Sequence, residues 1–90
     1  MKTVHLLIKG KVQGVFYRAT AKKVAQQLHL TGWVKNTREG AVEATASGTE
    51  QSITEFIAWC ERGPSSAMVT SVEVSLLDYK NFDDFSIKRD

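Results

Sequence analysis

The residues best suited to chemistry lie in a glycine-containing segment near the N-terminus, residues 10–18, which reads GKVQGVFYR. Gly10 and Gly14 can adopt positive φ at little steric cost, so the backbone can turn successive N–H groups toward one point. Such a concave row of N–H groups binds anions. Arg18 closes the segment, and its planar guanidinium can grip two phosphate oxygens at once. The segment therefore predicts an anion site, with plain turn glycines and a solvated arginine as the alternative.

The elements on either side of this segment strengthen that prediction. Apolar residues alternate with other residues from Val4 to Ile8, which predicts a strand that Gly10 ends. From Ala21 to Leu28 they recur at i, i+3, i+4 and i+7, which predicts a helix of about three turns. The start of a helix offers unpaired N–H donors and the positive end of its dipole, and both favour phosphate.

A second candidate residue, Asn36, ends the next expected strand. Residues 32–48 read GWVKNTREGAVEATASG, in which GWVKN and AVEATAS form an expected hairpin around turn residues 37–40. Val42, Ala44 and Ala46 share one face of the second strand, as a half-buried antiparallel strand requires. We therefore expect Asn36 at a strand end, beside the glycine-containing segment.

The rest of the chain repeats this order of elements. Helical spacing returns from Ile53 to Cys60, with Ser52 and Glu55 as the expected capping box and Thr49 as the alternative cap. Alternation then predicts a strand at residues 72–76 and a short edge strand at residues 85–87.

This order predicts an α+β fold, a ferredoxin-like βαββαβ sandwich in which two helices cover one face of an antiparallel sheet. With 90 residues, the chain has room for one domain, residues 1–90.

Composition excludes several classes of function. The net charge of +2, spread along the chain, is too small to indicate nucleic-acid binding. Cys60 is the only cysteine, so neither an intrachain disulfide nor a zinc site is expected. The longest apolar run near the N-terminus, Leu6 to Ile8, is too short for a signal peptide or a membrane span, so we expect a cytoplasmic protein with no membrane partner.

Together, the two candidate segments resemble the signature pair of the acylphosphatase family, and the resemblance covers essentially the whole chain. The first signature is matched by Gly10, Val12, Gln13, Gly14, Val15 and Arg18. The second is matched by Gly32, Trp33, Val34, Lys35, Asn36, Gly40, Val42 and Gly48. One departure is Tyr17, where family members commonly carry Phe, and its hydroxyl needs a partner or water.

The resemblance implies a hydrolase that cleaves small-molecule acyl phosphates without a metal or cofactor. In the family, the loop holds phosphate with backbone N–H groups, the matching arginine binds its oxygens, and the matching asparagine orients the attacking water. Carried over, Arg18 and Asn36 become catalytic, and the loop that holds phosphate or a similar anion comprises Gln13, Gly14, Val15, Phe16, Tyr17 and Arg18. We expect a monomer.

Neither segment holds a His, Cys or Asp that could act as a base or nucleophile. We therefore hypothesise that the substrate's own phosphate takes the proton of the water.

Other residues with chemical potential have simpler interpretations. His5, His29 and Cys60 are expected to be structural, since none lies in a pattern typical of catalysis. Trp33 and Trp59 are expected to pack. The basic residues near the predicted site either steer anions toward it or form an ordinary solvated face; they are Lys11, Lys35 and Arg38.

Rival functions of the same fold find less support. RNA binding would need aromatic residues on the central strands, and AVEATAS offers none. A metal carrier would need a C-x-x-C pair where the chain reads KVQG. A non-catalytic domain that binds anions stays open, although such a domain has no need of Asn36.

Overall fold

The computed structural model describes residues 1–89 and contains seven regular elements. In chain order these are β1 (Lys2–Lys11), α1 (Tyr17–Gln27), β2 (Thr31–Asn36), β3 (Val42–Gly48), α2 (Glu50–Arg62), β4 (Met68–Leu77) and β5 (Phe85–Ile87). The predicted order of elements is confirmed. The expected domain ends at Asp90, which lies outside the described residues.

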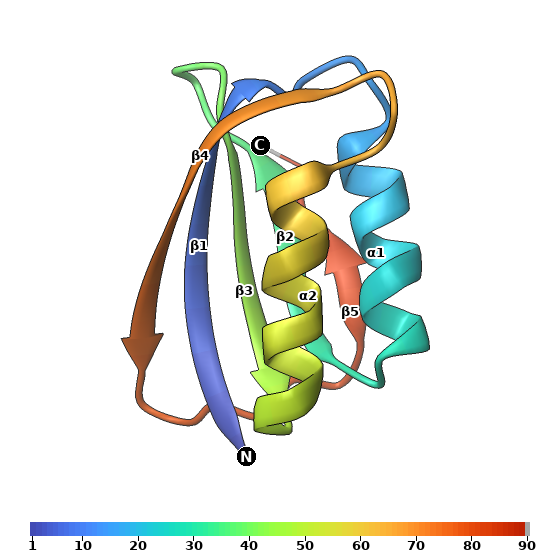
Figure 1. Ribbon diagram of the computed structural model, residues 1–90. Coiled ribbons are helices and arrows are strands. Elements are labelled where there is room, and N and C mark those ends of the chain that lie inside the picture. Colours follow the sequence, from blue (N-terminus) through green and yellow to red (C-terminus); the bar gives the residue numbers. More distant parts are fainter. Residues whose placement is uncertain (90) are drawn as a thin grey trace.

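The strands form a five-stranded sheet in the order β4-β1-β3-β2-β5, and both helices lie on one of its faces (Figure 1). The α+β, ferredoxin-like fold predicted from the sequence is confirmed. One detail differs from an antiparallel sheet, because β5 pairs in parallel with β2, with Val34 opposite Ile87.

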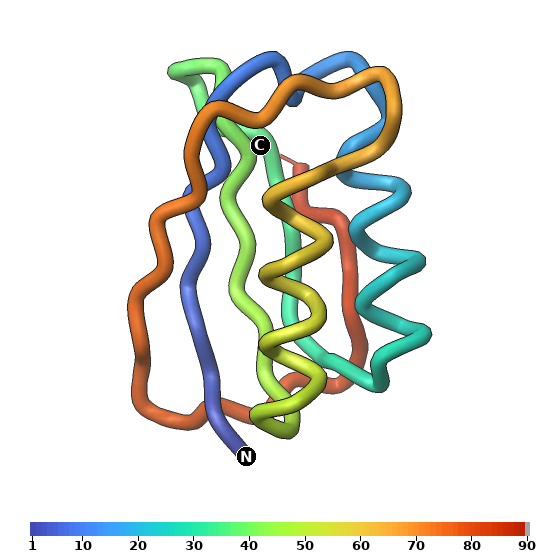
Figure 2. The backbone as a smooth tube through the Cα atoms, viewed as in Figure 1, coloured from blue at the N-terminus to red at the C-terminus, as the bar shows by residue number. Residues whose placement is uncertain are grey.

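The parallel pairing follows from the path of the chain. The segment after β4 crosses from one edge of the sheet to the other along the end where β4 finishes (Figure 2). From there β5 can only run back in the direction of β2. The backbone of Lys80 holds this crossing in place, because its N–H donates to Thr3 Oγ1 (2.8 Å) and its carbonyl accepts from Ser47 Oγ (2.6 Å).

The hydrophobic core lies between the sheet and the helices. Leu6, Ile8, Val34 and Phe56 are fully buried within it. α1 contributes Ala21 and Ala25, as its spacing predicts. Neither helix among the described residues has the length and apolar character that crossing a membrane takes.

Local boundaries differ from the sequence-based expectation in three places. β1 does not end at Gly10 but continues to Lys11, with an irregularity between Lys9 and Gly10. Glycine suits this position, because a side chain at Gly10 would collide with the Met68 carbonyl of β4. Thr49, not Ser52, caps α2, since Thr49 Oγ1 accepts from the Ser52 N–H at 3.2 Å. α1 ends at Gln27, so His29 follows the helix and takes a left-handed φ of 59°.

Four segments meet at one end of the molecule (Figures 1 and 2). They are the β1–α1 loop (residues 12–16), the β2–β3 turn (residues 37–41), the α2–β4 connection (residues 63–67) and residues 88–89 after β5. This end is called the loop end below.

Candidate active site

The β1–α1 loop has the backbone shape that the sequence predicts for an anion site. Gly14 adopts a φ of 72°, and Phe16, at the N-cap position of α1, adopts a φ of 65°. Phe16 makes no side-chain cap, so the first N–H groups of α1 receive no help from it. Within residues 1–89, no N–H group of residues 13–18 donates a hydrogen bond to another backbone carbonyl. These donors are therefore available to a ligand.

Arg18 and Asn36 come together at the loop end although they belong to different elements. Arg18 is the second residue of α1, and Asn36 is the last residue of β2. Both line one cavity of about 360 Å³, together with Lys88 and Arg89. The two side chains on which the sequence analysis depends therefore face a common space.

The side-chain carbonyl of Asn36 lacks an internal partner. Its Oδ1 is buried, and no group among residues 1–89 donates a hydrogen bond to it. A buried acceptor left unpaired costs about 1–3 kcal/mol, so such atoms call for a functional or structural reason. Because Oδ1 is closed to solvent, the remaining atoms of Asn36 form its share of the cavity wall.

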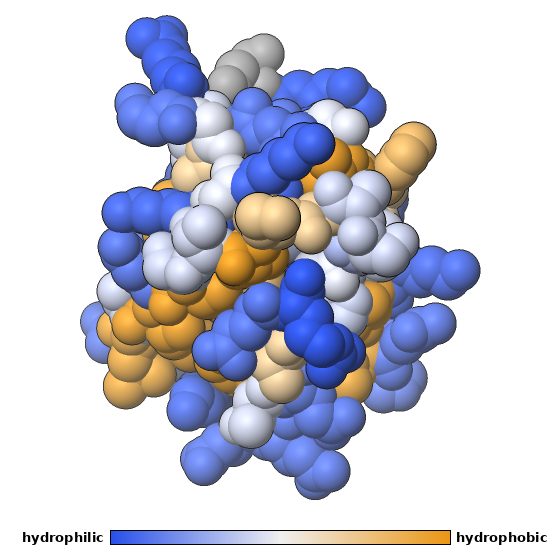
Figure 3. Space-filling view, turned by 45° about the horizontal axis from the view of Figure 1, so that its top comes forward, coloured by the Kyte–Doolittle hydropathy of each residue, from blue (hydrophilic) through white to orange (hydrophobic). Residues whose placement is uncertain are grey.

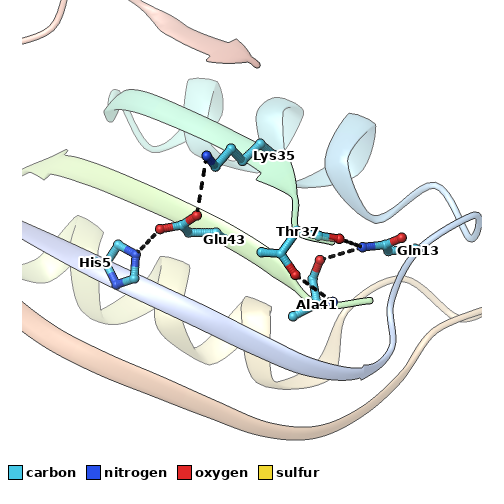
Figure 4. A network of polar contacts seen from close by, with 6 residues as sticks. All are labelled: His5, Gln13, Lys35, Thr37, Ala41 and Glu43. Carbon is cyan, nitrogen blue, oxygen red and sulfur yellow. Dashed lines mark hydrogen bonds and ion pairs between the residues drawn. The ribbon is translucent and has the colours of Figure 1, made fainter. Parts of the chain in front are cut away.

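Gln13 ties the loop to the hairpin that carries Asn36 (Figure 4). Its Nε2 donates to the carbonyls of Thr37 and Ala41, both at 2.8 Å. The Thr37 side chain closes the same turn, because Thr37 Oγ1 accepts from the Ala41 N–H. Gln13 is expected in the loop for its backbone N–H, and its side chain has this further role in the structure.

Two of the predicted loop residues point their side chains into the core. Val15 and Tyr17 are buried, so only their backbone can serve a ligand. The Tyr17 hydroxyl, which distinguishes this chain from the usual family pattern, donates to the Cys60 carbonyl at 2.8 Å. Burial raises the pKa of the Tyr17 phenol far above its ordinary value. The hydroxyl therefore stays protonated and serves packing.

The loop is also held from the α2–β4 connection. Ser66 Oγ donates to the Val15 carbonyl at 2.9 Å. At Gly63, a side chain would press against the Tyr17 ring, which stacks on Trp59. The packing roles expected for Tyr17's neighbours, Trp59 and Cys60, are confirmed, since Trp59 packs against the core and Cys60 is buried in it.

A family model for acylphosphatases matches residues 4–87. The chain belongs to the acylphosphatase family. The acylphosphatase of Methylococcus capsulatus is 46% identical over 91 residues, an alignment that covers 100% of this chain and 99% of that protein.

Solved acylphosphatase structures have the same fold. The structure from Coxiella burnetii superposes with a TM-score of 0.93 at 39% identity and covers 97% of this chain and 92% of that one. The structure from Bacillus subtilis superposes with a TM-score of 0.96 at 31% identity and covers 99% of this chain and 100% of that one.

Two basic residues that line the cavity lie outside both acylphosphatase signatures. Lys88 and Arg89 follow β5, and the Lys88 N–H donates to the Val34 carbonyl at 2.9 Å, which continues the pairing with β2. The Lys88 ammonium lies 4.5 Å from the centre of the Trp33 ring. The only signal in the sequence is the short strand before them, whose parallel pairing brings its end beside Asn36.

The basic residues predicted near the acylphosphatase site divide into two groups. Lys35 and Arg38 line a neighbouring cavity that also includes Asn36, but Glu39 and Glu43 share its wall and offset their charge. Lys11 lines none of the cavities described here and is exposed on β1. These three residues are therefore weaker candidates for binding phosphate than Lys88 and Arg89.

A polar cluster on the open face of the sheet was not predicted (Figure 4). His5 Nε2 lies 2.6 Å from Glu43 Oε2, and Lys35 Nζ lies 3.7 Å from Glu43 Oε1. The register of β1 and β3 explains the contact between His5 and Glu43. Thr45 lies opposite His5 and Glu43 lies opposite Leu7, so His5 and Glu43 are diagonal neighbours on one face of the sheet. No group of three or more His, Cys, Asp or Glu residues that could hold a metal ion occurs in residues 1–89.

Proposed function

We propose that this chain hydrolyses acyl phosphates to a carboxylate and orthophosphate, with Arg18 and the N–H groups of residues 13–18 holding the phosphate and Asn36 orienting the water. One observation carries the assignment of roles: Arg18 and Asn36 line the same cavity, beside a row of backbone donors with no internal backbone acceptor. Membership of the acylphosphatase family supports the reaction itself.

The reaction requires few groups because a carboxylate leaves easily. The water oxygen forms a bond to phosphorus while the bond from phosphorus to the carboxyl oxygen breaks, and the carboxylate leaves with that electron pair. The proton of the water passes to a phosphate oxygen of the substrate. Phosphoryl transfer of this kind depends on positioning and on stabilising charge, which is what the guanidinium and N–H donors supply.

Asn36 favours catalysis over mere binding. Its side-chain amide lines the cavity beside Arg18, and an N–H of this amide can donate to a water oxygen and hold that oxygen toward phosphorus. A domain that only binds an anion can rely on Arg18 and the backbone N–H donors alone.

The proposal includes no metal ion and no cofactor. The basic groups that line the cavity, Arg18, Lys88 and Arg89, can offset the charge of a phosphate. We also propose that the protein is a monomer in which residues 1–90 act as one domain. We place the enzyme in the cytoplasm, with inorganic phosphate or a similar anion able to occupy the loop.

An acyl phosphate assay tests this function. Acetyl phosphate and benzoyl phosphate are supplied with excess EDTA, beside p-nitrophenyl phosphate, whose phenolate is a poorer leaving group than a carboxylate. We expect hydrolysis of the two acyl phosphates, much slower turnover of the monoester, and rates that EDTA leaves unchanged. Loss of activity in EDTA would contradict the metal-free account, and an inactive wild type would leave an anion-binding domain as the better description.

A further inference from the structure

A second hollow adjoins the proposed phosphate site. It has a volume of about 310 Å³ and shares Arg18 and Arg89 with the cavity that contains Asn36. The rest of its wall is largely apolar, with Val12, Phe16 and Ile87 among its lining residues. The molecule therefore presents a charged cavity and a mainly apolar hollow side by side, with one arginine from α1 and one from the C-terminal segment between them.

Phe16 is an unusual residue for its position. Its side chain is 79% exposed, and its backbone is left-handed, with φ 65° and ψ 19°. A bulky residue in this region of φ and ψ is uncommon and costs on the order of 1 kcal/mol. The N-cap of a helix also favours Ser, Thr, Asp or Asn, which Phe16 cannot imitate. Neither local conformation nor the core accounts for an aromatic ring here.

The surroundings of Phe16 make it more than a stray exposed side chain. Figure 3 brings the loop end forward and shows mostly hydrophilic side chains with small hydrophobic areas between them. Phe16 is the most exposed of the large apolar residues. It lies two residues before Arg18, within the row of donors at residues 13–18 proposed to hold phosphate.

We propose that the hollow lined by Val12, Phe16 and Ile87 binds the acyl group of the substrate, and that Phe16 selects aromatic or branched aliphatic acyl groups over acetyl. This inference rests on the proposed function, since it takes the phosphate to lie at Arg18. In an acyl phosphate one oxygen atom separates phosphorus from the acyl carbon. A phosphate held at Arg18 therefore places its acyl group within reach of the hollow that shares this arginine.

Replacing Phe16 tests the inference by a change in selectivity. For Phe16→Ala we expect the ratio of kcat/KM for benzoyl phosphate to kcat/KM for acetyl phosphate to fall about tenfold, because the substitution removes the aromatic ring but keeps the backbone N–H of the loop. Phe16→Leu should keep part of the preference, because it retains an apolar surface. Leu76→Ala is the matched control, since Leu76 is 72% exposed on β4 and lines none of the cavities described here.

Binding measurements separate this inference from the proposed function. Acetylphosphonate and benzoylphosphonate carry a P–C bond in place of the hydrolysable P–O bond, so their affinities can be compared in any variant by calorimetry. We expect Phe16→Ala to weaken the binding of benzoylphosphonate about tenfold more than the binding of acetylphosphonate. An equal loss for both substrates and both analogues would mean that Phe16 only shapes the loop, and no loss at all would also overturn the inference. A wild type that binds both analogues but hydrolyses neither acyl phosphate would instead contradict the proposed function.

Discussion

At the scale of single residues, the account depends on the shape of the Arg18 side chain as much as on its charge. Arg18 lies in the first turn of α1, where the N–H groups of residues 13–18 have no backbone acceptor and the helix dipole has its positive end. A guanidinium can hold two phosphate oxygens in one plane, whereas a lysine ammonium can offer only a point charge.

Arg18→Ala should therefore lower kcat/KM for acetyl phosphate by at least about 100-fold, on the order of 3 kcal/mol of transition-state stabilisation. Arg18→Lys should recover little of this loss. Steady-state kinetics with inorganic phosphate as a competitive inhibitor measure both effects. Arg62→Ala, which removes an exposed arginine near the end of α2, is the control and should retain full activity. Full recovery in Arg18→Lys would show that charge alone suffices.

The sequence predicts Arg18 and Asn36 as site residues because both lie in segments whose residue types and spacing resemble the acylphosphatase signatures. It gives no comparable signal for Lys88 and Arg89, since their place beside Asn36 depends on the parallel pairing of β5 with β2. A basic residue near a chain end is usually a solvated charge, and only tertiary structure distinguishes this pair.

At the scale of elements, the central feature is the connection between the β1–α1 loop and the β2–β3 turn. The Gln13 amide bridges the two through the carbonyls of Thr37 and Ala41. Since Thr37 directly follows Asn36, this bridge fixes the distance between the loop proposed to hold phosphate and the residue proposed to orient the water. Gln13 is thus a positioning residue.

Gln13→Leu keeps much of the volume of the side chain and removes both donors. It removes two hydrogen bonds, although the two carbonyls keep those from the Gly40 and Thr37 N–H groups, so at about 0.5–1.5 kcal/mol per bond we expect a loss of about 1–3 kcal/mol in the free energy of unfolding. We also expect kcat for acetyl phosphate to fall about tenfold or more, with a smaller change in the inhibition constant of phosphate. Urea denaturation and steady-state kinetics measure the two effects. Gln27→Leu on the exposed side of α1 is the control. Reduced stability with unchanged kcat would leave Gln13 a purely structural role.

The elements themselves follow closely from periodicity, and their errors have local causes. Thr49, not Ser52, caps α2. The sequence offers both as polar residues near the helix start, and such a pattern does not determine the first residue of a helix to better than a few positions. The apolar alternation in residues 72–76 predicts β4 correctly, yet Val74 and Leu76 are exposed because β4 lies at the sheet edge, beyond the cover of the helices. Alternation predicts a strand but not whether it lies at the edge or in the centre of the sheet.

At the scale of the whole molecule, two buried groups that can lose a proton, the Tyr17 phenol and the Cys60 thiol, lie where α1 packs against α2. The Tyr17 hydroxyl bonds to the Cys60 carbonyl, and burial raises the pKa of the Cys60 thiol from 9.0 to about 12. An acid whose pKa is higher in the folded state keeps its proton there while the unfolded chain loses it. The folded protein then binds more protons, so its stability falls as pH rises through this interval.

We therefore expect the free energy of unfolding to decrease between about pH 9 and pH 12, with Cys60 contributing up to about 1.4 kcal/mol per pH unit. Tyr17 should add to the decrease above pH 10, since burial also raises its pKa. Urea titrations of the wild type and Cys60→Ala at several pH values isolate the contribution of the thiol to this decrease. The cavity left by the substitution lowers the free energy of unfolding by the same amount at every pH. Parallel curves for the two proteins would contradict a buried, protonated Cys60.

The overall architecture is predictable because hydrophobic spacing, turn residues and chain length agree on one arrangement. The contacts that build the site are less predictable. Gln13 bonds to Thr37, and Asn36 and Arg89 line one cavity. The residues of each pair are far apart in the sequence, and their proximity depends on the final register of the strands. The motif indicates which residues act, and the fold determines how they are held.

The most direct test of the account is Asn36→Ala, measured for both turnover of acetyl phosphate and binding of inorganic phosphate. Arg18 and the loop donors are unchanged in this variant, so phosphate should bind about as tightly as in the wild type, while kcat falls on the order of 100-fold because the water loses its orientation. Asn81→Ala, which removes an exposed asparagine from the β4–β5 crossing, should match the wild type in both measurements. Full turnover in Asn36→Ala would contradict the role of Asn36.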